Sequence, residues 1–136
     1  LVDPSSNNGN GGGGIVILIV NCGYIDMADN LIASMIHLGF HHYVLVPLDK
    51  VSYNVMNILY PGHVVPPYPS SSPEAAASES VEYGSRQFHK LTSTRASILK
   101  SFLEVGYTIY YCDLDTVWNK NALEYLSNRL IHYNNA

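Results

Sequence analysis

IVILIVNCGYIDMADNLIASMIHLGFHHYVLVPLD, residues 15–49, is the stretch that decides the fold of this chain. Residues 15–20 are all aliphatic, and the absence of polar alternation predicts a strand buried on both faces. Residues 43–48 form a second apolar run, closed by Pro47 and Asp49. A helix between two such strands makes a βαβ unit, so we expect parallel strands joined by a right-handed crossover.

The helix between these strands is marked by apolar residues at helical spacing: Ala28, Leu31, Ile32, Met35 and Ile36. Asp26 is placed to cap its start, and Gly39 is placed to end it. A second, short helix is expected over residues 55–59, with Ser52 as its cap. Residues 63–65 predict a short third strand.

A long helix is predicted from about residue 85 to residue 105, ended by Gly106. Its apolar stripe is Phe88, Leu91, Ile98, Leu99 and Phe102. Residues 107–112, YTIYYC, show little alternation and predict another strand. Asn119 is placed to cap a last helix that runs to Leu130.

This alternation of strands and helices predicts an α/β fold: a mainly parallel sheet with helices on both faces and strand 15–20 in its centre. Residues 1–14 are rich in Gly, Asn and Ser and predict a flexible lead-in. Residues 66–82 are rich in Pro and Ser and predict an exposed loop. The rest of 15–136 is expected to be one partial domain.

The charge balance argues against a nucleic-acid-binding surface, because 7 basic and 11 acidic residues leave a net charge of −4. A single bound nucleotide needs only a local positive or metal-filled pocket. Cys22 and Cys112 are too few for a disulfide framework, and buried free thiols are expected. No signal peptide or membrane-length apolar run is visible, but the chain begins with Leu1, so we expect a fragment of a longer protein.

Two carboxylates, Asp113 and Asp115, follow the predicted strand 107–112. Ligands of parallel α/β sheets bind at the carboxyl ends of the strands. Side chains two residues apart in an extended chain point the same way, about 7 Å apart, so the pair could share one hard cation bridging to a diphosphate. The alternative is a pair of turn carboxylates that only face solvent.

Arg95 lies on the apolar stripe of the long helix. A guanidinium on a buried face is costly unless it meets an anion, which could be Asp113, Asp115 or a phosphate. The alternative is that its side chain extends to the edge of the helix and into solvent. Asn21, at the end of the first strand, is a further candidate for contact with a bound nucleotide. The alternative there is an ordinary strand-to-helix turn.

Residues 88–118, FHKLTSTRASILKSFLEVGYTIYYCDLDTVW, resemble the nucleotide-diphospho-sugar transferase domain of glycosyltransferase family 77. The likeness lies in Arg95, in Leu103-Glu104-Val105-Gly106-Tyr107 and in Asp113-Leu114-Asp115-Thr116-Val117-Trp118. Asp49 after the second strand and Tyr60-Pro61-Gly62-His63 also match, so the resemblance covers residues 15–130.

The resemblance implies a GT-A fold and an enzyme that transfers a sugar, with retention of configuration, from a UDP-sugar to a glycan or glycoprotein. It implies Mn²⁺, or Mg²⁺, held by Asp113 and Asp115, with Asn21 and Arg95 also at the donor. It further implies a type II membrane protein on the lumenal side of the Golgi, with any membrane anchor in a longer parent chain. Such catalytic domains run well past the Asp-x-Asp, so this part alone is expected to bind the donor and to be inactive by itself.

Two other functions remain open from the residues alone. The first is a truncated or non-catalytic domain that binds a nucleotide or nothing. The second is a haloacid-dehalogenase-like phosphatase, whose motif also places two Asp residues after an apolar strand. That motif normally has a Gly before its Thr, whereas Thr116 follows Asp115 directly, and only 21 residues remain for its later acidic groups.

Overall fold

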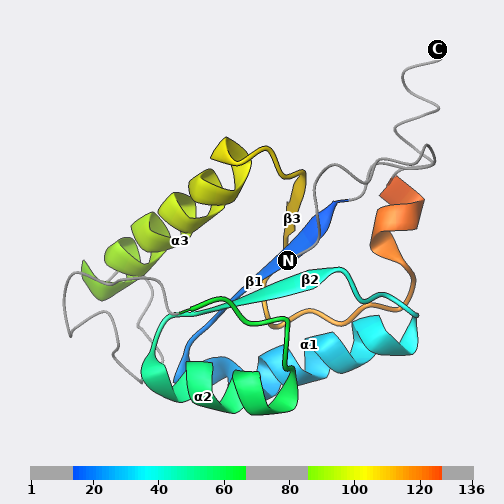
Figure 1. Cartoon of the computed structure of the whole chain (residues 1–136), viewed down its shortest axis with the longest axis horizontal. Coiled ribbons are helices and arrows are strands. Elements are labelled where there is room, and N and C mark those ends of the chain that lie inside the picture. Colours follow the sequence, from blue (N-terminus) through cyan, green and yellow to red (C-terminus); the bar gives the residue numbers. More distant parts are fainter. Residues whose placement is uncertain (1–13, 67–85, 127–136) are drawn as a thin grey trace.

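The computed structural model describes residues 14–66 and 86–126, with the side chains of 86–91 excepted. Its elements are β1 (Ile15–Val20), the short 3-10 helix η1 (Cys22–Tyr24), α1 (Ile25–His37), β2 (Tyr43–Pro47), α2 (Lys50–Leu59), α3 (Arg86–Glu104) and β3 (Ile109–Tyr111). Residues 122–126 form a further helical turn. Figure 1 shows these elements in the order and arrangement that an α/β fold requires.

The three strands form one parallel sheet in the order β2-β1-β3, so the first strand is central, as predicted. Val16 pairs with Tyr43 on one side and with Tyr110 on the other. The predicted third strand at 63–65 is reduced to a single parallel bridge between Val64 and Leu45. The predicted α/β architecture is therefore confirmed for the described residues.

Each face of the sheet is covered by helices, which lie on opposite sides of it in Figure 1. One core cluster joins β1 and β2 to the inner sides of α1 and α2: Val16, Leu18, Val20, Ala28, Leu31, Ile32, Met35, Phe40, Tyr43, Leu45 and Met56. The other joins the sheet to α3: Ile17, Ile19, Val46, Leu48 and Ile98. Alternate residues of β1 thus enter opposite clusters, which is why the strand has no polar position.

Three predicted helix caps are wrong. The turn Cys22–Tyr24 leads directly into α1, so Asp26 lies inside its first turn instead of capping it. Asp49, not Ser52, caps α2, because the Asp49 carboxylate accepts the Ser52 N–H at 2.8 Å. In the last helical turn the Glu124 N–H bonds to the side chain of Asn121 at 3.2 Å, in place of Asn119.

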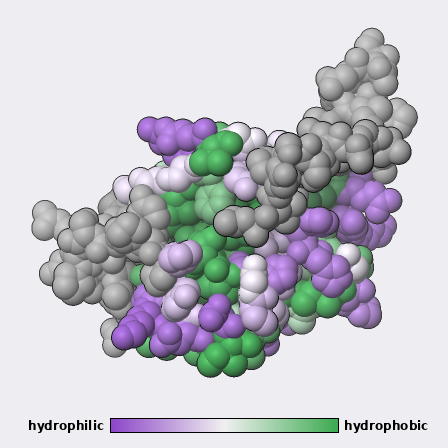
Figure 2. Space-filling view, in the orientation of Figure 1, coloured by the Kyte–Doolittle hydropathy of each residue, from purple (hydrophilic) through white to green (hydrophobic). Residues whose placement is uncertain are grey.

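The short helix expected at 55–59 is present as part of α2, which begins earlier, at Lys50. Only Ser52 and Met56 are buried on this helix, whereas Ile58 is 79% exposed and Leu59 is 50% exposed. Figure 2 shows hydrophobic surface at the lower edge of the molecule, where Figure 1 places α2. Apolar residues at helical spacing therefore do not all mark the buried side of this helix.

Strand β3 begins later than predicted because the end of α3 takes up the residues before it. The Gly106 N–H bonds to the Leu103 carbonyl at 2.9 Å, and the Tyr107 N–H bonds to the Phe102 carbonyl at 3.2 Å. Gly106 has a φ of 95°, a left-handed conformation that suits the helix end predicted there. Tyr107 therefore belongs to the helix terminus and not to the strand.

Several predictions lie outside the described residues. They are the lead-in at 1–13, the loop at 67–82, the side chains of Phe88 and Leu91, and the last helix beyond residue 126. Among the helices that are described, none is long and apolar enough to span a bilayer.

Candidate functional site

Three of the four predicted site residues, Asn21, Asp113 and Asp115, follow the carboxyl ends of strands, whereas Arg95 lies on α3. Because all three strands are parallel, the segments that follow them leave from the same edge. Asn21 follows β1, Asp49 follows β2, and Asp113 and Asp115 follow β3. In Figure 1 β1 and β2 end toward the left, whereas the short strand β3 ends near the centre and the chain after it runs along α1.

Asp113 and Asp115 both face solvent, because the residues between and around them face the core. Cys112, Leu114 and Trp118 are half-buried and pack against the α1 side of the core. Burial alternates along this segment, and both carboxylates are exposed. Residues 114 and 115 form a turn, however, and not the extended chain that the spacing predicted.

Asp113 is the better anchored of the two residues. Its Oδ1 accepts a hydrogen bond from the Tyr111 hydroxyl at 3.2 Å, and its carbonyl accepts one from the Thr116 hydroxyl at 2.8 Å. Burial raises the pKa of Tyr111 above its usual value, the positive charge of Arg95 lowers it, and the charge of Asp113 raises it. The Tyr111 hydroxyl therefore lies within electrostatic reach of both predicted donor-binding charges.

These residues suit a hard divalent cation only in part. Carboxylate oxygens are the ligands that Mn²⁺ and Mg²⁺ prefer, and Asp113 and Asp115 supply them from one exposed segment. No group of three or more His, Cys, Asp or Glu residues within 14–66 and 86–126 could hold a metal. Two carboxylates leave coordination positions for diphosphate oxygens and water, so the pair fits a metal that binds together with a nucleotide.

Arg95 has a buried donor without a partner. Its Nε lies out of contact with solvent and makes no hydrogen bond in the described part of the chain. Neither Asp113 nor Asp115 forms an ion pair with it among the described residues. A buried donor of a charged group is costly when it has no acceptor. None of the described residues supplies an acceptor for the Arg95 Nε–H.

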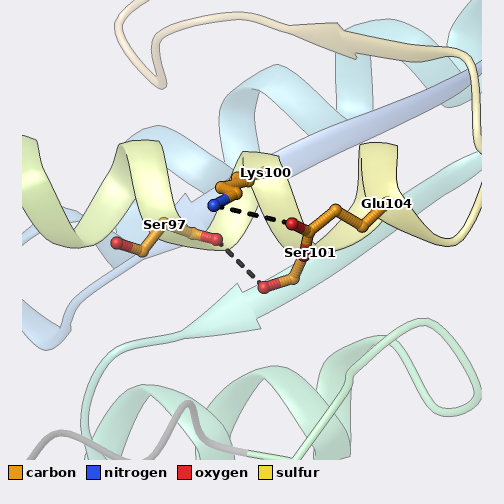
Figure 3. Close-up of polar contacts among 4 residues, drawn as sticks. All are labelled: Ser97, Lys100, Ser101 and Glu104. Atoms are coloured by element: carbon orange, nitrogen blue, oxygen red, sulfur yellow. Dashed lines mark hydrogen bonds and ion pairs between the residues drawn. The ribbon is translucent and has the colours of Figure 1, made fainter.

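The face of α3 that carries Arg95 is the inward one. Ile98, one turn further along, is 1% exposed and belongs to the core cluster of that side. The opposite face is shown in Figure 3, where Lys100 and Glu104 form an exposed ion pair at 3.5 Å and Ser101 bonds to the Ser97 carbonyl at 3.0 Å. The prediction that Arg95 shares the apolar stripe is therefore confirmed. Its Nε is buried, whereas the residue taken together is half-buried.

Asn21 offers an unpaired acceptor at the end of β1. The residue is 9% exposed, and its Oδ1 makes no hydrogen bond within the described residues. Its side chain does not cap η1, although its carbonyl accepts the Tyr24 N–H at 3.1 Å. The described residues therefore leave the Asn21 Oδ1 without a hydrogen-bond partner at this edge, and the contact with a nucleotide stays a prediction.

Asp49 is a structural residue of this edge that the sequence did not identify as one. Its carboxylate accepts the Cys22 N–H at 2.7 Å and the Ser52 N–H at 2.8 Å, and the residue is 7% exposed. It thereby ties the turn after β1 to the helix after β2. An Asp three residues before Ser52, directly after a strand, is itself a capping pattern, and that signal could have identified it.

Cys22 and Cys112 follow the neighbouring strands β1 and β3, and both are free thiols of intermediate burial. Burial raises the pKa of each thiol. In Cys112, hydrogen bonds from the Thr116 and Trp118 side chains act against that rise. Both thiols are therefore kept protonated at neutral pH.

A cavity of about 190 Å³ lies at the opposite, amino edge of the sheet. Its lining includes Ile15, His42, His63 and Phe102. The His63 ring stacks on Tyr43 with centroids 4.2 Å apart, and its Nδ1 lies 3.0 Å from the Tyr43 carbonyl. This cavity is separated from the carboxylates by the length of the strands and is not part of the candidate site.

The chain is similar in sequence to known proteins. Residues 38–136 match the family model described as nucleotide-diphospho-sugar transferase. UDP-D-xylose:L-fucose alpha-1,3-D-xylosyltransferase 3 of Arabidopsis thaliana is 31% identical over 111 residues, which are 81% of this chain and 28% of that protein. Its relative MGP4 is 28% identical over 114 residues, 83% of this chain and 31% of that protein.

The arabinosyltransferase XEG113 of the same plant is 40% identical over 47 residues, 35% of this chain and 7% of that protein. The chain therefore spans less than a third of the length of these relatives. No solved structure matches it. The family resemblance predicted from residues 88–118 is confirmed, and the comparisons do not favour the haloacid-dehalogenase alternative. The chain belongs to the nucleotide-diphospho-sugar transferase family.

Proposed function

We propose that this chain forms the donor-binding part of a glycosyltransferase that transfers a sugar from a UDP-sugar to a glycan or glycoprotein acceptor. The observation that carries the proposal is the buried Nε of Arg95, which has no hydrogen-bond partner among the described residues. Arg95 lies on the helix before the strand that leads to two exposed carboxylates. A diphosphate has negatively charged oxygens that can accept the hydrogen bond from the Arg95 Nε–H. It can also share a cation with Asp113 and Asp115.

Each residue then has a defined task. Asp113 and Asp115 hold Mn²⁺ or Mg²⁺ through their carboxylate oxygens, and Arg95 donates hydrogen bonds to the diphosphate. What the ion supplies when bound is neutralisation of the charge on the UDP leaving group. The free Oδ1 of Asn21 accepts a hydrogen bond from the nucleoside at the end of β1.

The names of the relatives support the choice of donor. Four of the proteins compared are named as UDP-D-xylose transferases, and a fifth as an arabinosyltransferase. UDP-xylose is therefore the first sugar donor to test. Retention of configuration and a location on the lumenal side of the Golgi membrane belong to the same proposal and are supported by the family resemblance alone.

Calorimetry with UDP, UMP and uridine in the presence of Mn²⁺ tests the diphosphate assignment. We expect UDP to bind most tightly and uridine to bind weakly, because only UDP offers a diphosphate to Arg95 and the metal. Arg95→Ala should weaken UDP binding by about 1.5–3 kcal/mol through the lost charge-assisted contact. Lys100→Ala is the matched control, since Lys100 is on the same helix but forms an exposed ion pair with Glu104.

Two results would count against the proposal. If Arg95→Ala and Lys100→Ala lower the affinity for UDP equally, the effect is one of general charge, and Arg95 does not contact the diphosphate. If UDP and uridine bind equally well, the site does not recognise a diphosphate at all.

A further inference from the structure

The loop that carries Asp113 and Asp115 lies beyond the end of the sheet. β3 pairs with β1 up to Tyr111, which is opposite Ile17, and this pair is two residues before Asp113. The ladder of backbone hydrogen bonds between strands therefore does not reach either carboxylate. Other contacts must fix the backbone that carries the two side chains.

One such contact comes from α1. The Ser34 hydroxyl accepts a hydrogen bond from the Trp118 N–H at 3.0 Å and donates one to the Leu31 carbonyl at 2.7 Å. The Leu31 carbonyl orients the hydroxyl by taking its hydrogen, which leaves the oxygen free to accept from the loop. Ser34 and Trp118 are 84 residues apart in sequence, so this bond joins two separate parts of the fold.

Two apolar side chains of the same loop, those of Leu114 and Trp118, also pack against the core. The Trp118 ring packs against Phe40 with ring centroids 5.2 Å apart, and Leu114 packs against the same core cluster. Leu114 lies between the two carboxylates in sequence, and Trp118 is three residues after Asp115. A change in the position of Trp118 therefore shifts the segment that carries both carboxylates.

We propose that Ser34 is a positioning residue for the metal site at Asp113 and Asp115, acting through the backbone N–H of Trp118. The proposal rests on the proposed function, because it requires these carboxylates to bind a metal. It assigns a role at the site to a helix residue that does not touch the carboxylates. Hydrogen bonds that hold metal ligands in place commonly change metal affinity by about 10–100-fold when they are lost.

The test compares the wild-type chain with Ser34→Ala, which removes the hydroxyl, and Ser34→Thr, which keeps one. Ser101→Ala is the matched control, because Ser101 is also a helix serine whose hydroxyl donates to a backbone carbonyl. Its hydroxyl oxygen lies 3.0 Å from the carbonyl oxygen of Ser97 (Figure 3). Calorimetry measures the affinity for Mn²⁺ at saturating UDP, and the affinity for UDP in EDTA. The fluorescence of Trp118, the single tryptophan of the chain, reports directly on the loop.

We expect Ser34→Ala to weaken Mn²⁺ binding by about tenfold and to shift the Trp118 emission, while its affinity for UDP in EDTA stays unchanged. Ser34→Thr should restore most of the affinity for Mn²⁺, and Ser101→Ala should bind Mn²⁺ as the wild-type chain does. A purely structural role would instead lower UDP binding with and without metal together.

Three outcomes would overturn the proposal. If Ser34→Ala binds Mn²⁺ as tightly as the wild-type chain, Ser34 does not position the site, although the proposed function stands. If Ser34→Ala loses UDP binding in EDTA to the same extent as in Mn²⁺, or if Ser34→Thr restores nothing, the effect is general destabilisation. If the wild-type chain shows no Mn²⁺-dependent UDP binding, both this proposal and the metal-assisted function fail.

Discussion

At the scale of single residues, the carboxyl edge of the sheet contains two kinds of polar group. Each carboxylate oxygen of Asp49 accepts one backbone N–H, from Cys22 at Oδ2 and from Ser52 at Oδ1. Asn21 and Arg95 instead keep a buried polar atom without a partner among the described residues. The first kind stabilises the folded chain, whereas the second kind costs stability unless a ligand completes it.

This contrast predicts that Asp49 contributes to stability. Asp49→Asn leaves one acceptor oxygen for two N–H donors and removes the charge from both hydrogen bonds. We expect the free energy of unfolding to fall by about 1–3 kcal/mol. Urea titration measures it, with Asp26→Asn as the control, because Asp26 is exposed in the first turn of α1. An equal, small effect of both substitutions would show that Asp49 does not join the two strand ends.

At the scale of elements, the start of β1 and the middle of β3 are in close contact. A Cβ atom added at Gly14 would lie 2.6 Å from Cδ2 of Tyr110 and still closer to its Cε2. Tyr110 is half-buried, and its ring packs against the core cluster on the α1 side. The glycine before the first strand is thus required by a contact with a strand about a hundred residues later.

Gly14→Ala should therefore destabilise the chain by about 1–3 kcal/mol, the usual cost of overpacking. The double variant Gly14→Ala/Tyr110→Ala separates this cause from a loss of chain flexibility. If overlap with the ring is responsible, adding Gly14→Ala to Tyr110→Ala should cost almost nothing in a chemical unfolding experiment. An equal cost in both backgrounds would contradict the contact.

The elements show how far the sequence alone can predict this fold. The uniform aliphatic run 15–20 and the glycines after α1 and α3 identified the central strand and the helix ends, because both signals are local. The caps at Asp49 and Asn121 were missed, because several polar residues near each helix start can cap it and only the backbone geometry selects one. The short helix expected at 55–59 is present, but the sequence did not show which of its apolar residues are buried, because that depends on how α2 lies on the sheet.

For the candidate site too, the sequence contains the local patterns but not the long-range contacts. Asp113 and Asp115 stood out because a pair of carboxylates after an apolar strand is a local pattern. Ser34 carried no such signal, since its partner Trp118 is 84 residues away and the contact exists only in the folded chain. Arg95 was identified by its place on an apolar helix face, a pattern that the sequence contains in full.

At the scale of the whole molecule, the titration of buried groups gives stability a definite pH dependence. Burial raises the pKa values of Cys112, Tyr43 and Tyr60, and each group is neutral when protonated. A group whose pKa is higher in the folded chain stabilises it below the unfolded pKa, about 9–10 here, and loses that contribution as pH rises toward the folded value.

We therefore expect the free energy of unfolding to fall as pH rises from 9 to 11. Tyr43→Phe should make that fall smaller, because it keeps the ring that stacks on His63 but removes one ionisable hydroxyl. Chemical unfolding at a series of pH values, under reducing conditions, measures both slopes. Stability that stays constant or rises through this range would contradict the burial of these groups.

The central claim is that this chain binds a UDP-sugar donor through a metal held by Asp113 and Asp115. The most direct measurement is calorimetric titration of UDP into the purified chain, with Mn²⁺ and with EDTA, for the wild-type chain and for Asp113→Asn/Asp115→Asn. The account predicts tight binding only for the wild-type chain in Mn²⁺, with a loss of about 1–3 kcal/mol for each carboxylate removed. Equal binding of UDP by both chains, in Mn²⁺ and in EDTA alike, would contradict it.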